Sequence, residues 1–134
     1  MSGEKSLQVI VEYYSTLQRQ LQNLDLRGNS LTEDNAELLY NSFPSIQLLN
    51  EIKIYQYKRD VTITEMDCNN LFLKLPEMKI IVCLLNSLKN KCHIHLLDVG
   101  NNLISAKALK VLAEGIRHVP LHELDISFNP CTLS

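Results

Sequence analysis

The chain has 134 residues, of which 46% are hydrophobic and 21% charged, and its formal net charge is −2. This composition is typical of one globular domain, and the near-neutral charge excludes a general attraction to nucleic acid or anionic lipid. The longest apolar run, Ile80 to Leu85, is far shorter than the ~18 residues that a membrane-spanning helix needs.

The N-terminal stretch MSGEKSLQVIVEYY lacks the apolar core and the small-residue cleavage site of a secretory signal. The cysteines contain no C-x-x-C pair, which favours free thiols over disulfides; they are Cys68, Cys83, Cys92 and Cys131. Both observations lead us to expect a cytoplasmic protein.

The predicted elements begin with a helix over residues 7–19, which would form an N-terminal helical cap over residues 1–20. The stretch LQNLDLRGNSL (21–31) follows, and its leucine spacing predicts a short strand that ends in a turn at Asn29. After Thr32, apolar residues at helical spacing predict a helix that ends before Pro44.

The next segment, LNEIKIYQYKR (49–59), repeats the strand pattern through Ile52 and Ile54 but has Tyr57 where asparagine is expected. The pattern fails between about residues 55 and 80, and two interpretations stay open. The stretch TEMDCNNLFLKL is either a helix within an insertion, which its likeness to TEDNA at residues 32–36 favours, or a compressed repeat with a strand on residues 71–73.

A helical stripe then begins at Ile81, and the strand pattern returns in IHLLDVGNNLI (94–104). A further stripe at residues 109–116 predicts another helix, and LHELDISFNPC (121–131) is the last strand pattern. These two strand patterns start 27 residues apart (121 − 94), and a motif L-x-x-L-x-L-x-x-N recurring at this period is specific.

On these motifs the chain over residues 21–134 resembles the leucine-rich repeat family, in its ribonuclease-inhibitor-like, long-repeat branch. The resemblance implies an α/β fold: a short right-handed solenoid of four or five units, irregular between about 55 and 80, with an open C-terminal end. Parallel strands would line the concave face and helices the convex face. The turn asparagines Asn29, Asn102 and Asn129 would stack one above another.

A solenoid would place the residue between the two strand leucines on the concave face, which gives a column of Asp25, Asp98 and Asp125 with Lys53 in the degraded repeat. Like charges at that spacing repel one another, which a cationic partner would relieve. We expect a protein partner to contact this face at Asn23, Asp25, Arg27, Glu51, Lys53, Tyr55, His95, Asp98, His122, Glu123, Asp125 and Ser127. Phe128 either joins this surface or packs within its turn.

Motifs for catalysis are absent from the sequence, which has no glycine-rich phosphate loop, nucleophile elbow or H-E-x-x-H. Cys92, His93 and His95 come nearest to a metal cluster but lack an evident fourth ligand, so we expect neither metal nor cofactor.

The final residues CTLS match a prenylation signal at Cys131, although no polybasic stretch precedes it. The sequence therefore predicts a non-catalytic protein–protein interaction module that binds no nucleic acid. The alternative is a prenylated, membrane-anchored regulatory or effector protein. Self-association through the open C-terminal edge is a further expectation.

Overall fold

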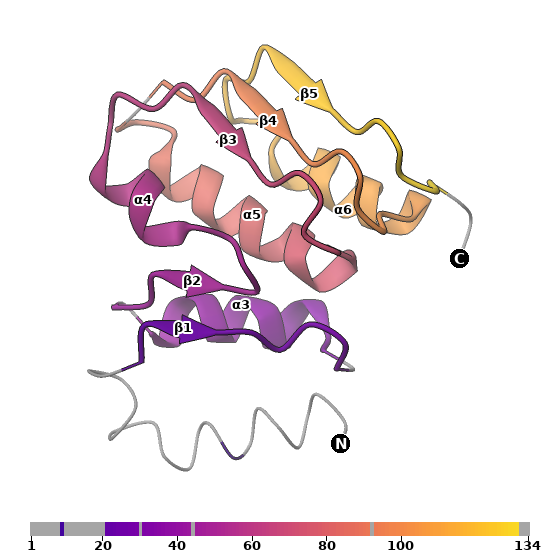
Figure 1. Cartoon of the computed structure of the whole chain (residues 1–134). Helices are drawn as coiled ribbons and strands as arrows, with labels where there is room; N and C mark the ends of the chain where they lie inside the picture. Colours follow the sequence, from indigo (N-terminus) through magenta and orange to yellow (C-terminus); the bar gives the residue numbers. More distant parts are fainter. Residues whose placement is uncertain (1–8, 10–20, 30, 44, 92, 132–134) are drawn as a thin grey trace.

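The computed structural model describes residues 9, 21–29, 31–43, 45–91 and 93–131, along which short strands and helices alternate (Figure 1). The strands are β1 (Asn23–Leu24), β2 (Leu48–Leu49), β3 (Glu65–Asp67), β4 (Leu96–Asp98) and β5 (Glu123–Asp125). The helices are α3 (Glu33–Ser42), α4 (Ile54–Arg59), α5 (Leu75–Leu88) and α6 (Ala106–Gly115). The helix and cap expected at residues 1–20 lie outside the described residues, apart from Val9.

The strands form two separate parallel sheets, which overturns the predicted leucine-rich repeat solenoid. β1 pairs with β2, while β3, β4 and β5 form a three-stranded sheet in that order. Neither sheet is closed or curled, so the described strands do not line one concave face (Figure 1). Leu26 accordingly follows β1 in one sheet, whereas Val99 and Ile126 follow β4 and β5 in the other.

The chain leaves the first sheet at Asn50 and Glu51, directly after β2. Both residues have positive φ angles, 50° and 68°. This backbone conformation is uncommon for residues other than glycine, although asparagine adopts it more often than most. The turn is closed by paired backbone hydrogen bonds of 3.1 and 2.9 Å between Leu49 and Ile52. Helix α4 then begins at Ile54, so the strand predicted through Ile52 and Ile54 is wrong.

Residues 64–74 contain β3 and a loop, and α5 begins at Leu75, so both interpretations of this segment are wrong. Met66 is fully buried between exposed neighbours, which is the alternation of a strand. Asn70 and Phe72 both have positive φ, which a helix or an extended strand over residues 71–73 does not allow.

The helices predicted after Thr32, from Ile81 and from residue 109 are confirmed as α3, α5 and α6, although α5 begins at Leu75, six residues before the predicted start. Helix α5 packs against both α3 and α6 (Figure 1), and all of its buried residues except Glu77 are apolar. Its fully buried Leu84 illustrates the strength of this core, since truncation of such a leucine to alanine costs about 2–5 kcal/mol.

Helices α5 and α6 approach each other closely at Gly115. A methyl group on Gly115 would lie 2.5 Å from both Cγ atoms of Val82, so no larger residue fits unless Val82 moves. No helix in the described part of the chain is long and apolar enough to cross a membrane.

Candidate functional site

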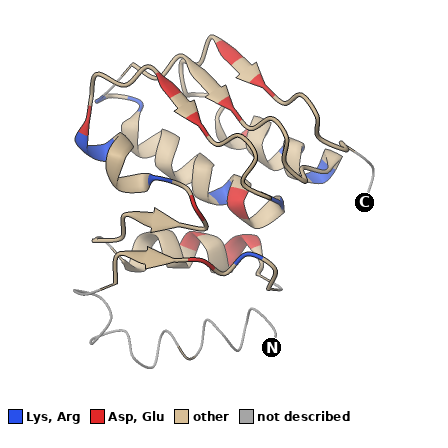
Figure 2. Ribbon diagram, viewed as in Figure 1, with Lys and Arg blue, Asp and Glu red and all other residues tan. Residues whose placement is uncertain are grey.

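The outward side of the β3–β4–β5 sheet carries a group of carboxylates, which we call the acidic sheet face. Strand register places Glu65, Leu96 and Glu123 side by side. Two residues further along the strands, it places Asp67, Asp98 and Asp125 side by side. The residue between the two rows on each strand points the other way, and Met66 and Leu97 are fully buried there. Figure 2 shows the resulting acidic positions on all three strands. The acidic sheet face comprises Glu65, Asp67, Asp98, Glu123 and Asp125.

Each aspartate of this face also holds the turn that follows its strand. Asp67 Oδ1 accepts the Asn69 N–H at 3.0 Å, and Asp98 Oδ1 accepts the Gly100 N–H at 2.8 Å. Asp125 Oδ1 accepts both the N–H of Ser127 at 2.9 Å and its hydroxyl at 2.6 Å. These local bonds fix where each carboxylate lies while leaving most of its charge uncompensated.

Hydrogen bonding also keeps Asp125 ionised. The Ser127 hydroxyl and N–H hold the pKa of the Asp125 carboxyl below its usual value. Within the described ranges, none of the five carboxylates of the acidic sheet face forms an ion pair with a lysine, arginine or histidine. Asp98 receives instead the neutral amide of Asn69, at 3.3 and 3.4 Å. The face is therefore a preformed, negatively charged surface.

Two stacked asparagines support the turns beneath this face. The buried Asn102 accepts the N–H groups of Leu71 and Leu73 at 3.0 Å each and donates to the Cys68 and Val99 carbonyls at 2.9 Å. Asn129 accepts the Asn102 N–H at 3.1 Å, so these two asparagines adjoin as expected.

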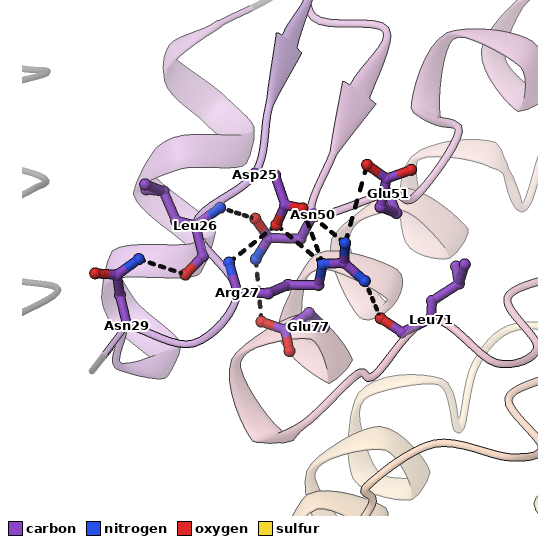
Figure 3. Close-up of polar contacts among 8 residues, drawn as sticks. All are labelled: Asp25, Leu26, Arg27, Asn29, Asn50, Glu51, Leu71 and Glu77. Atoms are coloured by element: carbon purple, nitrogen blue, oxygen red, sulfur yellow. Dashed lines mark hydrogen bonds and ion pairs between the residues drawn. The ribbon is translucent and has the colours of Figure 1, made fainter.

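Asn29 does not continue the stack. It is exposed, and its side chain donates to the Leu26 carbonyl at 3.1 Å rather than to another turn asparagine. Asn50 serves the first sheet instead, because its Oδ1 accepts the Leu26 N–H at 2.8 Å (Figure 3).

Asp25, Arg27 and Glu51, which were predicted for the binding face, form a separate cluster (Figure 3). Arg27 binds both carboxylate oxygens of Asp25, at 2.9 Å from Nε and 2.7 Å from Nη2, lies 4.0 Å from Glu51, and donates to the Leu71 carbonyl. These hydrogen bonds hold the pKa of Asp25 below and that of Arg27 above their usual values. Since Arg27 pairs with both carboxylates and also bonds the loop after β3, this cluster ties the first sheet to that loop and has a structural role.

Glu77 lies at the same junction and is only 3% exposed. Its carboxylate accepts the Lys74 N–H at 2.8 Å, which caps α5, and the Asn50 side-chain amide at 3.1 Å (Figure 3). Burial raises the pKa of this carboxyl above its usual value, although the two hydrogen bonds and the charge of Arg27 oppose the rise.

The remaining predicted residues are dispersed. Asn23 is in β1, which belongs to the other sheet, so it does not adjoin the aspartate row. Lys53 directly precedes α4, and its charge acts on Cys68, the residue that follows Asp67. Tyr55 is on α4, where the Arg59 guanidinium lies 5.7 Å from its ring centroid. His95 and His122 lie at the amino ends of β4 and β5, next to the acidic sheet face.

Two phenylalanines at the loops after β3 and β5 are displayed to solvent. Phe72 is 64% and Phe128 82% exposed, and both have a positive φ of 57°. The alternative that Phe128 packs within its turn is therefore wrong. Asn70 and Asn101 occupy the position three residues after the strand aspartate in β3 and β4, and Phe128 holds that position after β5 in the same conformation.

The thiols are consistent with the expected free cysteines, since Cys68, Cys83 and Cys131 form no disulfide. Burial raises the pKa of the Cys68 thiol to about 12, which makes it unreactive. Cys131 is half-buried, while Cys92 and the last residues, 132–134, lie outside the described part. Among the residues that the structure describes, no group of three or more His, Cys, Asp or Glu side chains is arranged to hold a metal ion.

Sequence reasoning found Asp98, Glu123 and Asp125 of the acidic sheet face but missed Glu65 and Asp67.

No protein-family model matches the sequence, and no curated protein matches it significantly.

Proposed function

We propose that this chain is a non-catalytic binding module whose acidic sheet face takes up a basic segment of a partner protein. The observation that supports this most is the in-register row of Asp67, Asp98 and Asp125. Neighbouring strands are about 4.8 Å apart, so these carboxylates repel one another, and a lysine or arginine placed among them relieves that repulsion.

The acidic sheet face is suited to binding because its geometry is already fixed. The turns after the strands are held by the aspartates themselves and by Asn102 and Asn129. A partner therefore loses little free energy to ordering this surface, and electrostatic attraction accelerates the encounter.

Phe128 supplies an apolar contact at one end of the face. It lies three residues beyond Asp125 and is 82% exposed, and aromatic residues are enriched at protein interfaces. The partner segment that fits best carries alternating basic residues followed by an apolar side chain.

Charge-neutralising substitutions that preserve shape test this proposal. In the double variant Glu123→Gln/Asp125→Asn, the asparagine oxygen still accepts the Ser127 N–H, so the turn is retained. A fluorescein-labelled peptide of alternating lysine and serine that ends in leucine serves as the probe, with fluorescence anisotropy at low ionic strength as the measurement. We expect at least threefold weaker binding than to the unmodified protein, because about two charge contacts are lost.

The matched control is Asp34→Asn/Glu114→Gln, which removes the same two kinds of charge from helices α3 and α6. It should leave peptide affinity unchanged apart from a small effect of net charge. Equal weakening in both double variants would show that the peptide responds to net charge alone and would refute the proposal. Affinity capture from a cell lysate with the two baits then identifies the natural partner as a protein that the control retains and Glu123→Gln/Asp125→Asn loses.

A further inference from the structure

A hollow of about 260 Å³ lies at the amino ends of β4 and β5, beside the acidic sheet face. Its charged lining residues are basic rather than acidic. We call it the histidine hollow. Its rim carries Lys89, Lys91, His93, His95 and His122, and the buried Ile94 contributes to its floor.

Backbone pairing brings the histidines together from two connections of the fold. The His95 carbonyl accepts the N–H groups of His122 and Glu123 at 2.8 and 2.9 Å, which sets the starts of the two strands side by side. The rings of His95 and His122 meet edge to face with centroids 4.8 Å apart, and the His93 ring is stacked with the His95 ring at a centroid distance of 6.4 Å. Three imidazoles therefore gather at one place.

The histidine hollow has donors and positive charge but no acidic residue among its described lining residues. Neither lysine of its rim forms an ion pair within the described ranges. An ammonium group offers three N–H donors, and an imidazole offers at least one in either protonation state. This set matches a group with several oxygens and a double negative charge better than it matches a carboxylate.

The floor adds an apolar component. A small crevice lined by Leu85, Leu88 and Val119 shares Lys89, Ile94 and Pro120 with the histidine hollow. Sites for organic ligands combine such an apolar floor with a few polar groups that fix orientation.

We infer that the histidine hollow binds a phosphate monoester, with its oxygens at the lysines and imidazoles and its organic part over Ile94. A phosphorylated side chain of a protein and a small organic phosphate both offer this chemistry. The site is separate from the acidic sheet face and does not depend on a basic segment binding there.

The test is an NMR titration of the ¹⁵N-labelled full chain with inorganic phosphate and with phenyl phosphate, at constant ionic strength kept with sodium chloride. We expect amide shifts concentrated at residues 89–95 and 119–123, and phenyl phosphate to bind about threefold more tightly because it covers the floor. The variant Lys89→Gln/Lys91→Gln should bind phenyl phosphate at least fivefold more weakly. Both lysines are exposed, so the fold is expected to persist.

The matched control is Lys107→Gln/Lys110→Gln on α6, which should keep the affinity of the unmodified protein. Shifts that the Lys89→Gln/Lys91→Gln variant retains, or that sodium chloride alone reproduces, would overturn the inference.

A third arm compares phenyl phosphate with a phosphoserine peptide. Tighter binding of the peptide supports a phosphorylated protein as the source, and tighter binding of phenyl phosphate supports a small organic phosphate. Because these probes are anions, a negative result leaves the binding of a lysine peptide to the acidic sheet face standing.

Discussion

Substitution of Phe128 tests whether this residue serves binding at the surface rather than the stability of the fold. Its φ of 57° lies in the left-handed region, which costs an ordinary L residue about 1–2 kcal/mol. Asparagine adopts this conformation several-fold more often than most residues, and it stands at the corresponding position 101 after β4. Phe128 is 82% exposed, so it recovers little of this cost by packing.

The decisive comparison is between Phe128→Asn and Phe128→Ala, because both variants lose the same ring contacts. Only asparagine is suited to the left-handed backbone, so Phe128→Asn should be more stable than Phe128→Ala by about 1 kcal/mol. That difference corresponds to a melting temperature about 3–6 °C higher for a domain of this size.

Thermal unfolding followed by circular dichroism, with urea titration as a second measurement, gives this difference directly. If Phe128→Asn proves no more stable than Phe128→Ala, the reasoning about backbone strain is refuted. Phe128→Asn should also bind the leucine-ending peptide more weakly than the unmodified protein does. A variant that keeps or gains stability while losing affinity would separate the two roles of this residue.

Other changes test the buried polar groups and the thiols. The pKa of Glu77 is raised in the folded protein, so its contribution to stability is complete below the unfolded-state pKa near 4.5 and is lost as pH rises through the folded-state pKa. Urea unfolding between pH 4 and 8 should show this decline in the free energy of unfolding, and Glu77→Gln should abolish it. Asn102→Ala leaves several buried backbone groups without partners and should lower the free energy of unfolding by about 3 kcal/mol or more, whereas Asn29→Ala should cost under about 1 kcal/mol in the same urea titration. Iodoacetamide at pH 8 should leave Cys68 unlabelled in the folded protein, as peptide mass spectrometry would show, because burial raises its thiol pKa to about 12. Cys131 should stay unmodified in eukaryotic cells because it is half-buried; a farnesyl group found by intact-mass measurement would support the membrane-anchored alternative instead.

Local periodicity was enough to predict the long helices, because α3, α5 and α6 each bury a stripe of apolar side chains at helical spacing. It was not enough to predict how the strands assemble. The chain turns out of the first sheet through the left-handed backbone at Asn50 and Glu51, and apolar spacing carries no signal for that conformation.

The acidic sheet face was half predicted for a related reason. Met66 and Asp67 have the same roles as Leu97 and Asp98, 31 residues later, and that likeness was the available signal. It was missed because Leu71 stands where the motif has Asn102. Asn102 accepts the Leu71 N–H, so one asparagine supports the turns after both β3 and β4. A sequence pattern that expects one asparagine after each strand therefore does not recognise β3.

Helix α5 connects the two halves of the described fold, whose two sheets are not paired with each other. It packs against α3, which accompanies the first sheet, and against α6, which accompanies the second. Loss of either α3 or α6 would expose buried apolar residues of α5, so each half of the fold depends on the other to keep this helix covered. The two sheets should therefore melt as one cooperative unit, with the slowest amide hydrogen exchange in α5 rather than in either sheet.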